Sequence, residues 1–76
     1  MSLAVVPPGV IHALRLTGRE LDCLRHASNG RTARQTGILE GLSEKTVKAY
    51  IAGARGKLEA VSTTHAVAIA IREGLL

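Results

Sequence analysis

The sequence predicts an all-α domain of four helices, two of which form a helix-turn-helix. From Leu16 to the C-terminus the apolar residues recur at helical spacing, and no segment alternates between apolar and polar residues as a strand does. Between residues 30 and 58, two helical segments flank a short turn containing Gly41, an arrangement typical of a helix-turn-helix. Serine or threonine precedes each helical segment, where it would cap the helix.

Length and charge restrict the kind of protein further. The 76 residues suffice for one small domain, which buries about 60% of the surface of its unfolded chain. Ten Lys and Arg against six Asp and Glu give a formal net charge of +4, which favours a polyanionic partner. Charge of this size also occurs in proteins that bind no nucleic acid, so it carries little weight alone.

Residues 1–15 differ in composition from the rest of the chain. Pro7, Pro8 and Gly9 follow one another, which favours an extended segment over a packed one. We expect a linker, or a segment added for expression, in which case the natural protein extends further upstream. The folded domain is then expected to comprise residues 16–76.

The first helix is expected to begin at Thr17. Glu20 stands three residues later, the spacing of a capping box in which side chain and backbone cap each other reciprocally. The helix should serve as scaffold. Its expected buried residues are Leu21, Leu24 and Ala27, and its expected end is at Asn29 and Gly30.

The second helix is expected to begin near Thr32, with Gln35 as the reciprocal cap. It is short, continuing through Ile38 and Leu39. Gly41 then supplies the bend, because glycine adopts positive φ at little cost, and Leu42 is expected to plug the core beneath the turn.

The third helix has Ser43 as its expected N-cap. Its apolar residues recur at i, i+4, i+7 and i+11, which defines a buried stripe of Val47, Ile51, Ala54 and Leu58. The remaining residues face outward, and this outer face includes Glu44, Lys45, Lys48, Ala49, Ala52, Arg55 and Gly56.

The fourth helix is expected from about residue 62 or 63 to residue 72 or 73. Its centre, AVAIAI, is apolar almost all round, more than one face against the core requires. The surplus apolar surface, assigned to Val67, Ala70 and Ile71, suggests a contact with the same helix of a second subunit. The alternative is a helix wrapped entirely within one domain, for which so small a chain offers little other material.

Nothing in the sequence forms a catalytic or metal-binding group of residues. His12, His26 and His65 are not at metal-ligand spacing, and no cofactor is implied. Glu20 and Asp22 are expected on an exposed helical turn, where paired carboxylates are solvated or pair with a neighbouring arginine. Gly53 and Gly56 lie within a helix and lack the strand that precedes a phosphate-binding loop. We therefore expect no enzymatic activity.

The cysteine and the apolar runs indicate the compartment. Cys23 is the only cysteine and lies on an apolar helical pattern, so we expect it to be buried and unreactive, as suits a reducing cytoplasm. No apolar run reaches the roughly 20 residues that span a bilayer, and the first residues lack the basic start of a signal peptide.

Several of these segments together resemble a known family. The motifs LTGRE, TVK, KL and GLL, at their spacing across residues 16–76, are similar to those of the LuxR-type (GerE-like) DNA-binding domain. The residues that carry the resemblance are Leu16, Thr17, Arg19, Glu20, Leu24, Ala27, Gly30, Leu42, Ser43, Thr46, Val47, Lys48, Lys57, Leu58, Ala66, Val67, Ala70, Gly74, Leu75 and Leu76.

The resemblance implies a three-helix core followed by a C-terminal dimerisation helix, in a bacterial transcriptional regulator. It implies that the third helix, residues 43–57, enters the major groove of double-stranded DNA, and that the fourth pairs two subunits on a dyad-symmetric site. Family members usually carry this domain behind an acyl-homoserine-lactone-binding or a phosphoacceptor domain, and neither is present here. The stretch ILEGLSEKTVKAY resembles the quorum-sensing, acyl-homoserine-lactone branch somewhat more.

The resemblance also suggests which residues contact DNA. Lys48 matches the TVK lysine and is expected to contact base edges, the alternative being a solvated surface lysine. Ala49 and Ala52 lie beside it, where small side chains touch a thymine methyl or let the helix approach. Contacts with phosphates are expected from Thr32, Arg34, Lys45, Thr46, Tyr50, Arg55 and Thr63. Ser43 and Thr63 have helix capping as an alternative role, and Arg55 and Lys57 are weaker candidates.

The chain departs from the family at three of these positions. Tyr50 stands where His is usual, and its hydroxyl has a phosphate or a core acceptor as equal alternatives. Gly53 replaces the usual Asn, and with Gly56 it costs the helix about 1 kcal/mol per glycine. Thr63 replaces the usual Arg, which removes a charged contact with the backbone.

A different function for the same fold remains open. The basic face would then bind RNA polymerase or another regulator, with marginal affinity for DNA, because a fold does not fix a function.

Overall fold

The computed structural model describes residues 15–76, and within them it contains four helices and no strand. They are α2 (Gly18–Ser28), α3 (Ala33–Glu40), α4 (Glu44–Lys57) and α5 (Thr63–Arg72). The all-α, four-helix prediction is confirmed. The linker expected at residues 1–15 lies outside the described residues except for Arg15, and His12 lies outside them as well.

Each helix begins at the capping residue that the sequence indicated. Thr17 and Thr32 form capping boxes with Glu20 and Gln35, respectively. Ser43 caps α4 by accepting from the backbone N–H of Thr46, at 3.0 Å. Ser62 caps α5, which leaves Thr63 as the first helical residue. These side chains satisfy N–H groups that have no partner within the helix, and they therefore set where each helix starts.

The turn between α3 and α4 depends on two glycines. Gly41 has φ 68°, the left-handed conformation expected of it. Gly37, which the sequence analysis overlooked, is buried and accepts a 2.8 Å hydrogen bond from the backbone N–H of Leu42. A Cβ at Gly37 would collide with the carbonyl oxygen of Leu42, so this crossing of the chain has no room for a side chain.

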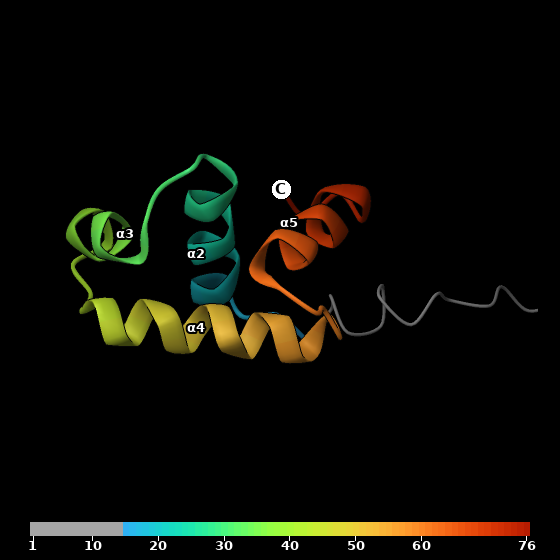
Figure 1. Ribbon diagram of the computed structural model, residues 1–76, viewed down its shortest axis with the longest axis horizontal. Coiled ribbons are helices and arrows are strands. Elements are labelled where there is room, and N and C mark those ends of the chain that lie inside the picture. Colours follow the sequence, from blue (N-terminus) through green and yellow to red (C-terminus); the bar gives the residue numbers. More distant parts are fainter. Residues whose placement is uncertain (1–14) are drawn as a thin grey trace, which may run out of the picture.

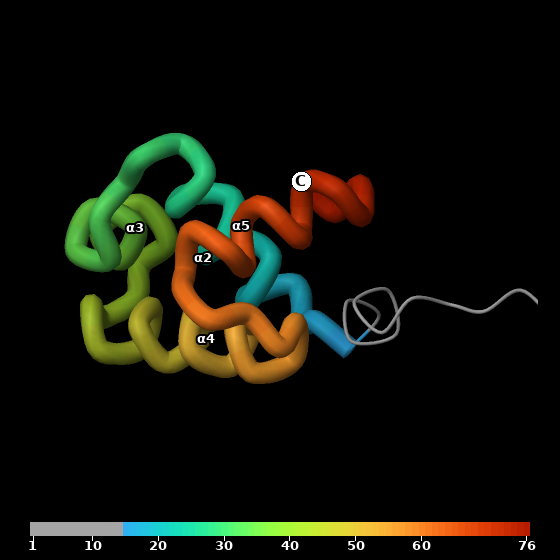
Figure 2. The backbone as a smooth tube through the Cα atoms, turned by 45° about the vertical axis from the view of Figure 1, so that its right-hand side comes forward, coloured from blue at the N-terminus to red at the C-terminus, as the bar shows by residue number. Residues whose placement is uncertain are grey.

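The helices pack around α2. In Figure 1, α4 runs along one edge of the domain, with α3 over its N-terminal end and α2 over its middle. Helix α5 lies beside α2, on the side away from α3 in Figure 1, and in the turned view of Figure 2 it passes across α2. Helix α4 is continuous through Gly53 and Gly56.

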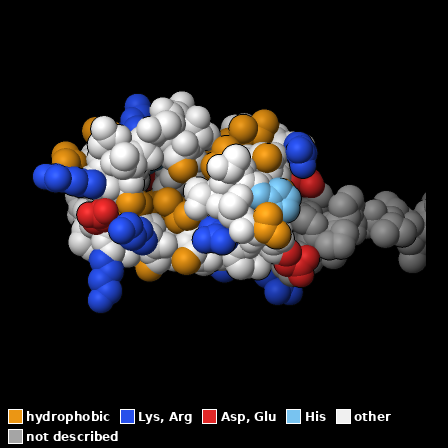
Figure 3. Space-filling view, in the orientation of Figure 1, with side chains coloured by type: hydrophobic (Ala, Val, Ile, Leu, Met, Phe, Trp, Pro, Cys, Tyr) orange, Lys and Arg blue, Asp and Glu red, His pale blue; other side chains and the backbone are white. Residues whose placement is uncertain are grey.

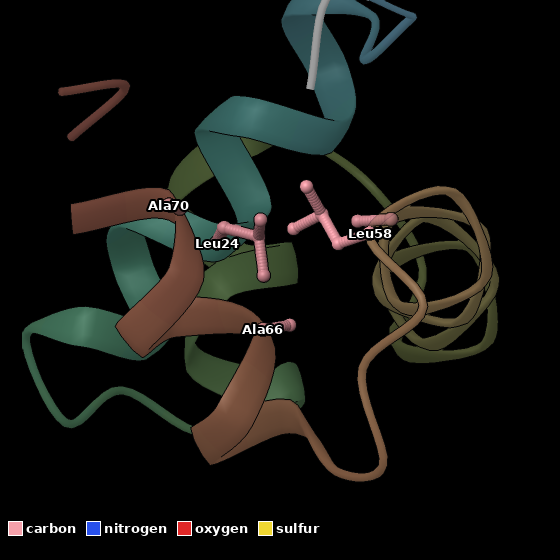
Figure 4. Packing of buried hydrophobic residues seen from close by; sticks show 5 residues of the cluster. Leu24, Leu58, Ala66 and Ala70 are labelled. Carbon is pink, nitrogen blue, oxygen red and sulfur yellow. The ribbon is translucent and has the colours of Figure 1, made fainter. Parts of the chain in front are cut away.

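The core lies where α2, α4 and α5 meet (Figure 4). Leu24, Leu58, Ala66 and Ala70 point toward one another there and are at most 2% exposed. Burial of Val47, Ala54 and Leu58 on α4 is confirmed, whereas Leu21, Ala27, Ile51 and Leu42 are half-buried. Cys23 is fully buried, as expected, and burial raises the pKa of its thiol, with smaller contributions from Glu40 and Asp22.

The expectation that Glu20 is exposed is wrong. Its exposed fraction is 5%, and its Oε1 lies 2.7 Å from Nζ of Lys57 and 2.8 Å from the backbone N of Thr17. Lys57 also donates to the carbonyl of Arg15, at 3.1 Å. Lys57 therefore joins the end of α4 to the start of α2, and its charge is neutralised there rather than offered to a phosphate.

Within the described residues, no helix is long and apolar enough to cross a membrane.

Candidate nucleic-acid interface

The N-terminal half of α4 presents the face on which base contacts are expected. Lys45, Lys48, Ala49 and Ala52 are all exposed, while Val47 on the opposite side is fully buried. The helix is therefore anchored in the domain along one side and free along the other. The major groove of DNA is wide enough to admit an α-helix, and the exposed side of α4 is the side that could enter it.

Lys48 is not free of other interactions. Its Nζ lies 3.4 Å from Oε1 of Glu44, one turn earlier on α4, and both side chains are more than half exposed. An exposed pair of this kind is worth only about 0.3–0.5 kcal/mol. Lys48 can therefore leave Glu44 for a base or phosphate at small cost.

The hydroxyls at the start of α4 bond to each other. Ser43 Oγ donates to Thr46 Oγ1 at 2.8 Å and accepts from the backbone N–H of Thr46. This occupies Ser43 as the cap, the alternative that the sequence left open. Thr46 is half-buried and keeps its own hydroxyl hydrogen for a phosphate oxygen.

A hollow of about 350 Å³ adjoins this face of α4. It is open to solvent and borders on helices α3 and α5 at their first turns. Its walls carry three basic side chains and one hydroxyl, over a small apolar floor. The lining residues are Ala27, Arg31, Ala33, Lys48, Ile51, Ala52, Arg55 and Thr63.

Figure 3 shows this face of the molecule, with Lys and Arg side chains gathered over α3, α4 and the α2–α3 loop. Among the described residues, no carboxylate pairs with Arg31, Arg34, Lys45 or Arg55. Their charges are not neutralised, and the first turns of α3 and α5 add the positive ends of two helix dipoles. Such a surface attracts anions.

The remaining expected phosphate contacts differ in their surroundings. Thr32 and Arg34 are exposed at the start of α3, although Thr32 Oγ1 already accepts the capping bond from Gln35. Arg55 is half-buried and donates from one terminal nitrogen to the carbonyl of Val61, at 3.2 Å. Its Nε is buried and has no hydrogen-bond partner among the described residues. Thr63 lines the hollow with Arg55.

Tyr50 is half-buried on α4. Its hydroxyl makes no hydrogen bond to any residue in the described part of the chain, so the core acceptor considered for it is not observed there. Tyr50 does not line the hollow. The phosphate contact remains the expectation for this residue.

Sequence reasoning missed one basic residue of this surface. Arg31 is exposed, stands in the loop before α3 and lines the hollow with Lys48 and Arg55. The sequence did contain a signal for this residue: Arg31 directly precedes the N-cap Thr32, and a basic residue there lies beside the positive end of the helix. Its side chain bonds to His26, which in turn bonds to Glu40.

The expected dimer surface on α5 needs a correction. Ala70 is fully buried in the core of its own domain, so it has no surface to offer a second subunit. Ile71 is 55% exposed and Val67 is half-buried. Val67 and Ile69 pack against the core cluster with part of their surface, so Ile71 is the exposed large apolar side chain of α5.

No group of His, Cys, Asp and Glu able to hold a metal ion occurs among residues 15–76.

Comparison with known proteins gives the family. Residues 14–70 match the family described as "Bacterial regulatory proteins, luxR family". Over 72 residues the chain is 36% identical to the transcriptional activator protein BjaR1 of Bradyrhizobium diazoefficiens, covering 95% of this chain and 30% of that protein.

Two further relatives are also transcriptional regulators by name. The chain is 38% identical over 73 residues to the HTH-type quorum sensing-dependent transcriptional regulator RpaR of Rhodopseudomonas palustris, covering 96% of this chain and 30% of the relative. It is 34% identical over 61 residues to the uncharacterized transcriptional regulatory protein YhcZ of Bacillus subtilis, covering 80% and 28%. The chain thus spans about 30% of the length of these relatives. With a family match over most of its length and the helix-turn-helix in place, the chain belongs to the LuxR family of bacterial transcriptional regulators, with a DNA-binding helix-turn-helix domain.

Proposed function

We propose that this domain binds double-stranded DNA in the cytoplasm as a homodimer on dyad-symmetric sites, and that it regulates transcription by doing so. In this proposal α4 enters the major groove. Lys48, Ala49 and Ala52 meet base edges, and the residues at the starts of α3, α4 and α5 hold the sugar-phosphate backbone.

One observation carries the proposal. The hollow brings Lys48, Ala52 and Arg55 of α4 together with the first residues of α3 and α5, Ala33 and Thr63. Four basic residues on or near it, Arg31, Arg34, Lys45 and Arg55, have no carboxylate partner among the described residues. A recognition helix whose exposed face adjoins the N-terminal ends of two other helices can enter a groove while those ends approach phosphates of the DNA backbone.

The decisive experiment is selection of bound sequences from a pool of random duplexes, with the full chain as the bait. We expect enriched sites with dyad symmetry. Affinity for such a site should fall steeply with salt, log K decreasing by about 0.9 for each phosphate contacted per unit of log salt. No enrichment, or affinity that does not change with salt, would contradict DNA binding.

A second candidate function rests on an apolar patch on α3. Ile38 and Leu39 are 74% and 59% exposed and, with Arg31 and Gln35, line a shallow hollow of about 300 Å³. Exposed apolar side chains beside a basic one suit a protein partner, and RNA polymerase is the one that a transcription activator would need. Ile38→Ser should then reduce transcription in a reconstituted assay while leaving the affinity for DNA unchanged.

The inducing signal is a further proposal. Several relatives carry "quorum sensing-dependent" in their names, and we infer that this chain also acts in quorum sensing rather than downstream of a phosphorylation relay. A reporter driven by the selected site should rise with cell density in the source cell. Addition of an enzyme that degrades acyl-homoserine lactones should abolish the rise, and a reporter that ignores the enzyme would contradict the inference.

A further inference from the structure

A chain of polar side chains runs from α2 across the end of α3 to the α2–α3 loop. His26 on α2 places Nε2 at 3.1 Å from Oε2 of Glu40, the last residue of α3. On its other side, Nδ1 of His26 lies 3.1 Å from a terminal nitrogen of Arg31. Arg19 lies 3.4 Å from the second oxygen of Glu40. His26 and Glu40 are largely shielded, with side chains 17% and 24% exposed.

The partners of His26 fix the tautomer of its ring. Arginine is a donor only, so Nδ1 must accept and carries no hydrogen. The neutral ring then has its hydrogen on Nε2 and donates it to the Glu40 carboxylate. Both ring nitrogens are satisfied only in this state.

Arg31 is held at two points. Its backbone N–H donates to the carbonyl of His26 at 3.1 Å, and its guanidinium donates to the ring of the same residue. One of the five guanidinium N–H groups suffices for that bond, and the others remain available. Because the ring is neutral and no carboxylate in residues 15–76 pairs with Arg31, the charge of Arg31 is not neutralised.

We propose that Arg31 binds a DNA phosphate at the hollow that it shares with Lys48, Arg55 and Thr63, and that His26, oriented by Glu40, is the positioning residue that holds Arg31 for this contact. The proposal rests on the DNA binding proposed above. An arginine that is already restrained loses less rotamer freedom when it binds, and the phosphate contact is correspondingly stronger.

Only the neutral ring can perform this role. A protonated His26 carries a donor on each nitrogen, so it cannot accept from Arg31 and repels it, while its bond to Glu40 is strengthened. The charged groups around the ring are Glu40 from α3, Arg31 from the loop and Arg19 from α2, and Asp22 on α2 is bonded to Arg25. Protonation of the ring would therefore release Arg31 from its position.

The direction in which DNA affinity changes with pH distinguishes loss of the positioned Arg31 from a change in the net charge of the protein. A protein that gains positive charge as the pH falls ordinarily binds DNA more tightly. Loss of a positioned arginine acts in the opposite direction. A fall in affinity on acidification therefore points to the arrangement of His26 and Arg31 rather than to net charge.

The test compares four proteins by their affinity for a duplex selected by the wild-type chain, at about pH 7.5 and about pH 5.5 and constant ionic strength. The three variants are Arg31→Ala, His26→Asn and His26→Leu. Asparagine keeps a hydrogen-bond acceptor near the position of Nδ1 but does not titrate, whereas leucine has no acceptor. We expect the wild type to lose about threefold to tenfold in affinity at the lower pH, the effect of weakening one charge-assisted hydrogen bond.

The variants should separate the two residues. Arg31→Ala should bind more weakly at the higher pH, with a salt slope smaller by about 0.9, and should show no acid loss. His26→Asn should keep the wild-type affinity at both pH values, and His26→Leu should be weak at both. Circular dichroism and thermal unfolding of each variant, measured at both pH values, show whether the variant is folded. If His26→Leu does not fold, the affinity of His26→Asn at the two pH values still tests the role of His26.

Three results would overturn the inference: a wild-type salt slope in Arg31→Ala, an acid loss in His26→Asn equal to that of the wild type, or a wild-type affinity that rises on acidification. Absence of binding by the wild type at either pH, to any duplex, would instead refute the DNA-binding function itself.

Discussion

At the residue scale, the two glycines of α4 illustrate how neighbours decide the effect of one side chain. A Cβ at Gly56 meets nothing within 4 Å. A Cβ at Gly53 would lie 2.5 Å from Oε2 of Glu20, whose other oxygen is bonded to Thr17 and Lys57. Gly53 therefore makes room for a buried carboxylate, which explains in physical terms why this position lacks a side chain.

Gly56→Ala should stabilise the domain by about 0.5–1 kcal/mol, because alanine favours the helix over glycine. Gly53→Ala should give no such gain, and a loss if Glu20 cannot shift, since its carboxylate must move out of its hydrogen bonds. The measurement is the free energy of unfolding in denaturant. In a Glu20→Ala background Gly53→Ala should recover the gain, and equal effects of Gly53→Ala and Gly56→Ala in the wild type would contradict the steric argument.

Lys48 and Lys45 are neighbours on the exposed face of α4, yet we expect different effects from their removal. Lys48→Ala should reduce discrimination between the preferred site and a site with one altered base pair, by about 1–3 kcal/mol. Lys45→Ala should weaken binding to all sequences alike and lower the salt slope by about 0.9. Binding curves on matched and altered duplexes test both, and equal, uniform losses would remove base reading from Lys48.

At the scale of the elements, Glu20 and Lys57 connect the start of α2 to the end of α4. Burial raises the pKa of Glu20, but the hydrogen bonds from Lys57 and from the Thr17 backbone outweigh burial and leave this pKa below its usual value. The ionised form is thus stabilised in the folded state. Ionised Glu20 therefore adds to the free energy of unfolding at pH values above the pKa of a glutamate in the unfolded chain, about 4.3. This contribution is lost as the pH falls through the lower pKa of Glu20 in the folded state.

Glu20→Gln should therefore lower the free energy of unfolding at neutral pH by about 1.5–3 kcal/mol, the range for a hydrogen bond to a charged group. The difference between wild type and variant should shrink as the pH falls below about 4, where the wild-type carboxylate is protonated. Denaturant unfolding between neutral and acid pH measures it. Glu73→Gln, at the C-terminal end of α5, serves as a control, and a difference that persists unchanged in acid would contradict the role of the ion pair.

The elements themselves were predictable because their signals are local. The helix starts were predictable from capping residues, whose hydrogen bonds reach only three residues along the chain. These residues are Thr17, Thr32 and Ser43. Gly37 and Glu20 could not be understood this way, because the contacts that restrict them come from other helices and turns. Of the candidate site, outward placement of Lys45, Lys48, Ala49 and Ala52 followed from helical period, whereas Arg31 depends on His26 and Glu40, which only the fold brings together.

At the scale of the whole molecule, α5 both completes the core and offers a surface. Ala66 and Ala70 fill the space against α2 and α4, so small side chains are required on that side. Ile71 remains 55% exposed and Val67, Leu75 and Leu76 only half-buried. This partly exposed apolar surface is where the proposed second copy would bind.

Val67→Glu and Ile71→Glu should each block self-association, because a symmetric contact between two α5 helices would bring like charges together in an apolar interface. Ile71→Glu should keep the helical fold because Ile71 is 55% exposed, whereas Val67 also packs against the core, so circular dichroism must first show that Val67→Glu is folded. Leu39→Glu, on the exposed side of α3, is the matched control and should associate as the wild type does. Sedimentation equilibrium measures the association, and binding to duplexes with one or two half-sites shows whether the second half-site adds affinity. Unchanged association of well-folded Ile71→Glu and Val67→Glu would exclude α5 as the interface, and the two-fold symmetry proposed for the DNA site would then need another contact to produce it.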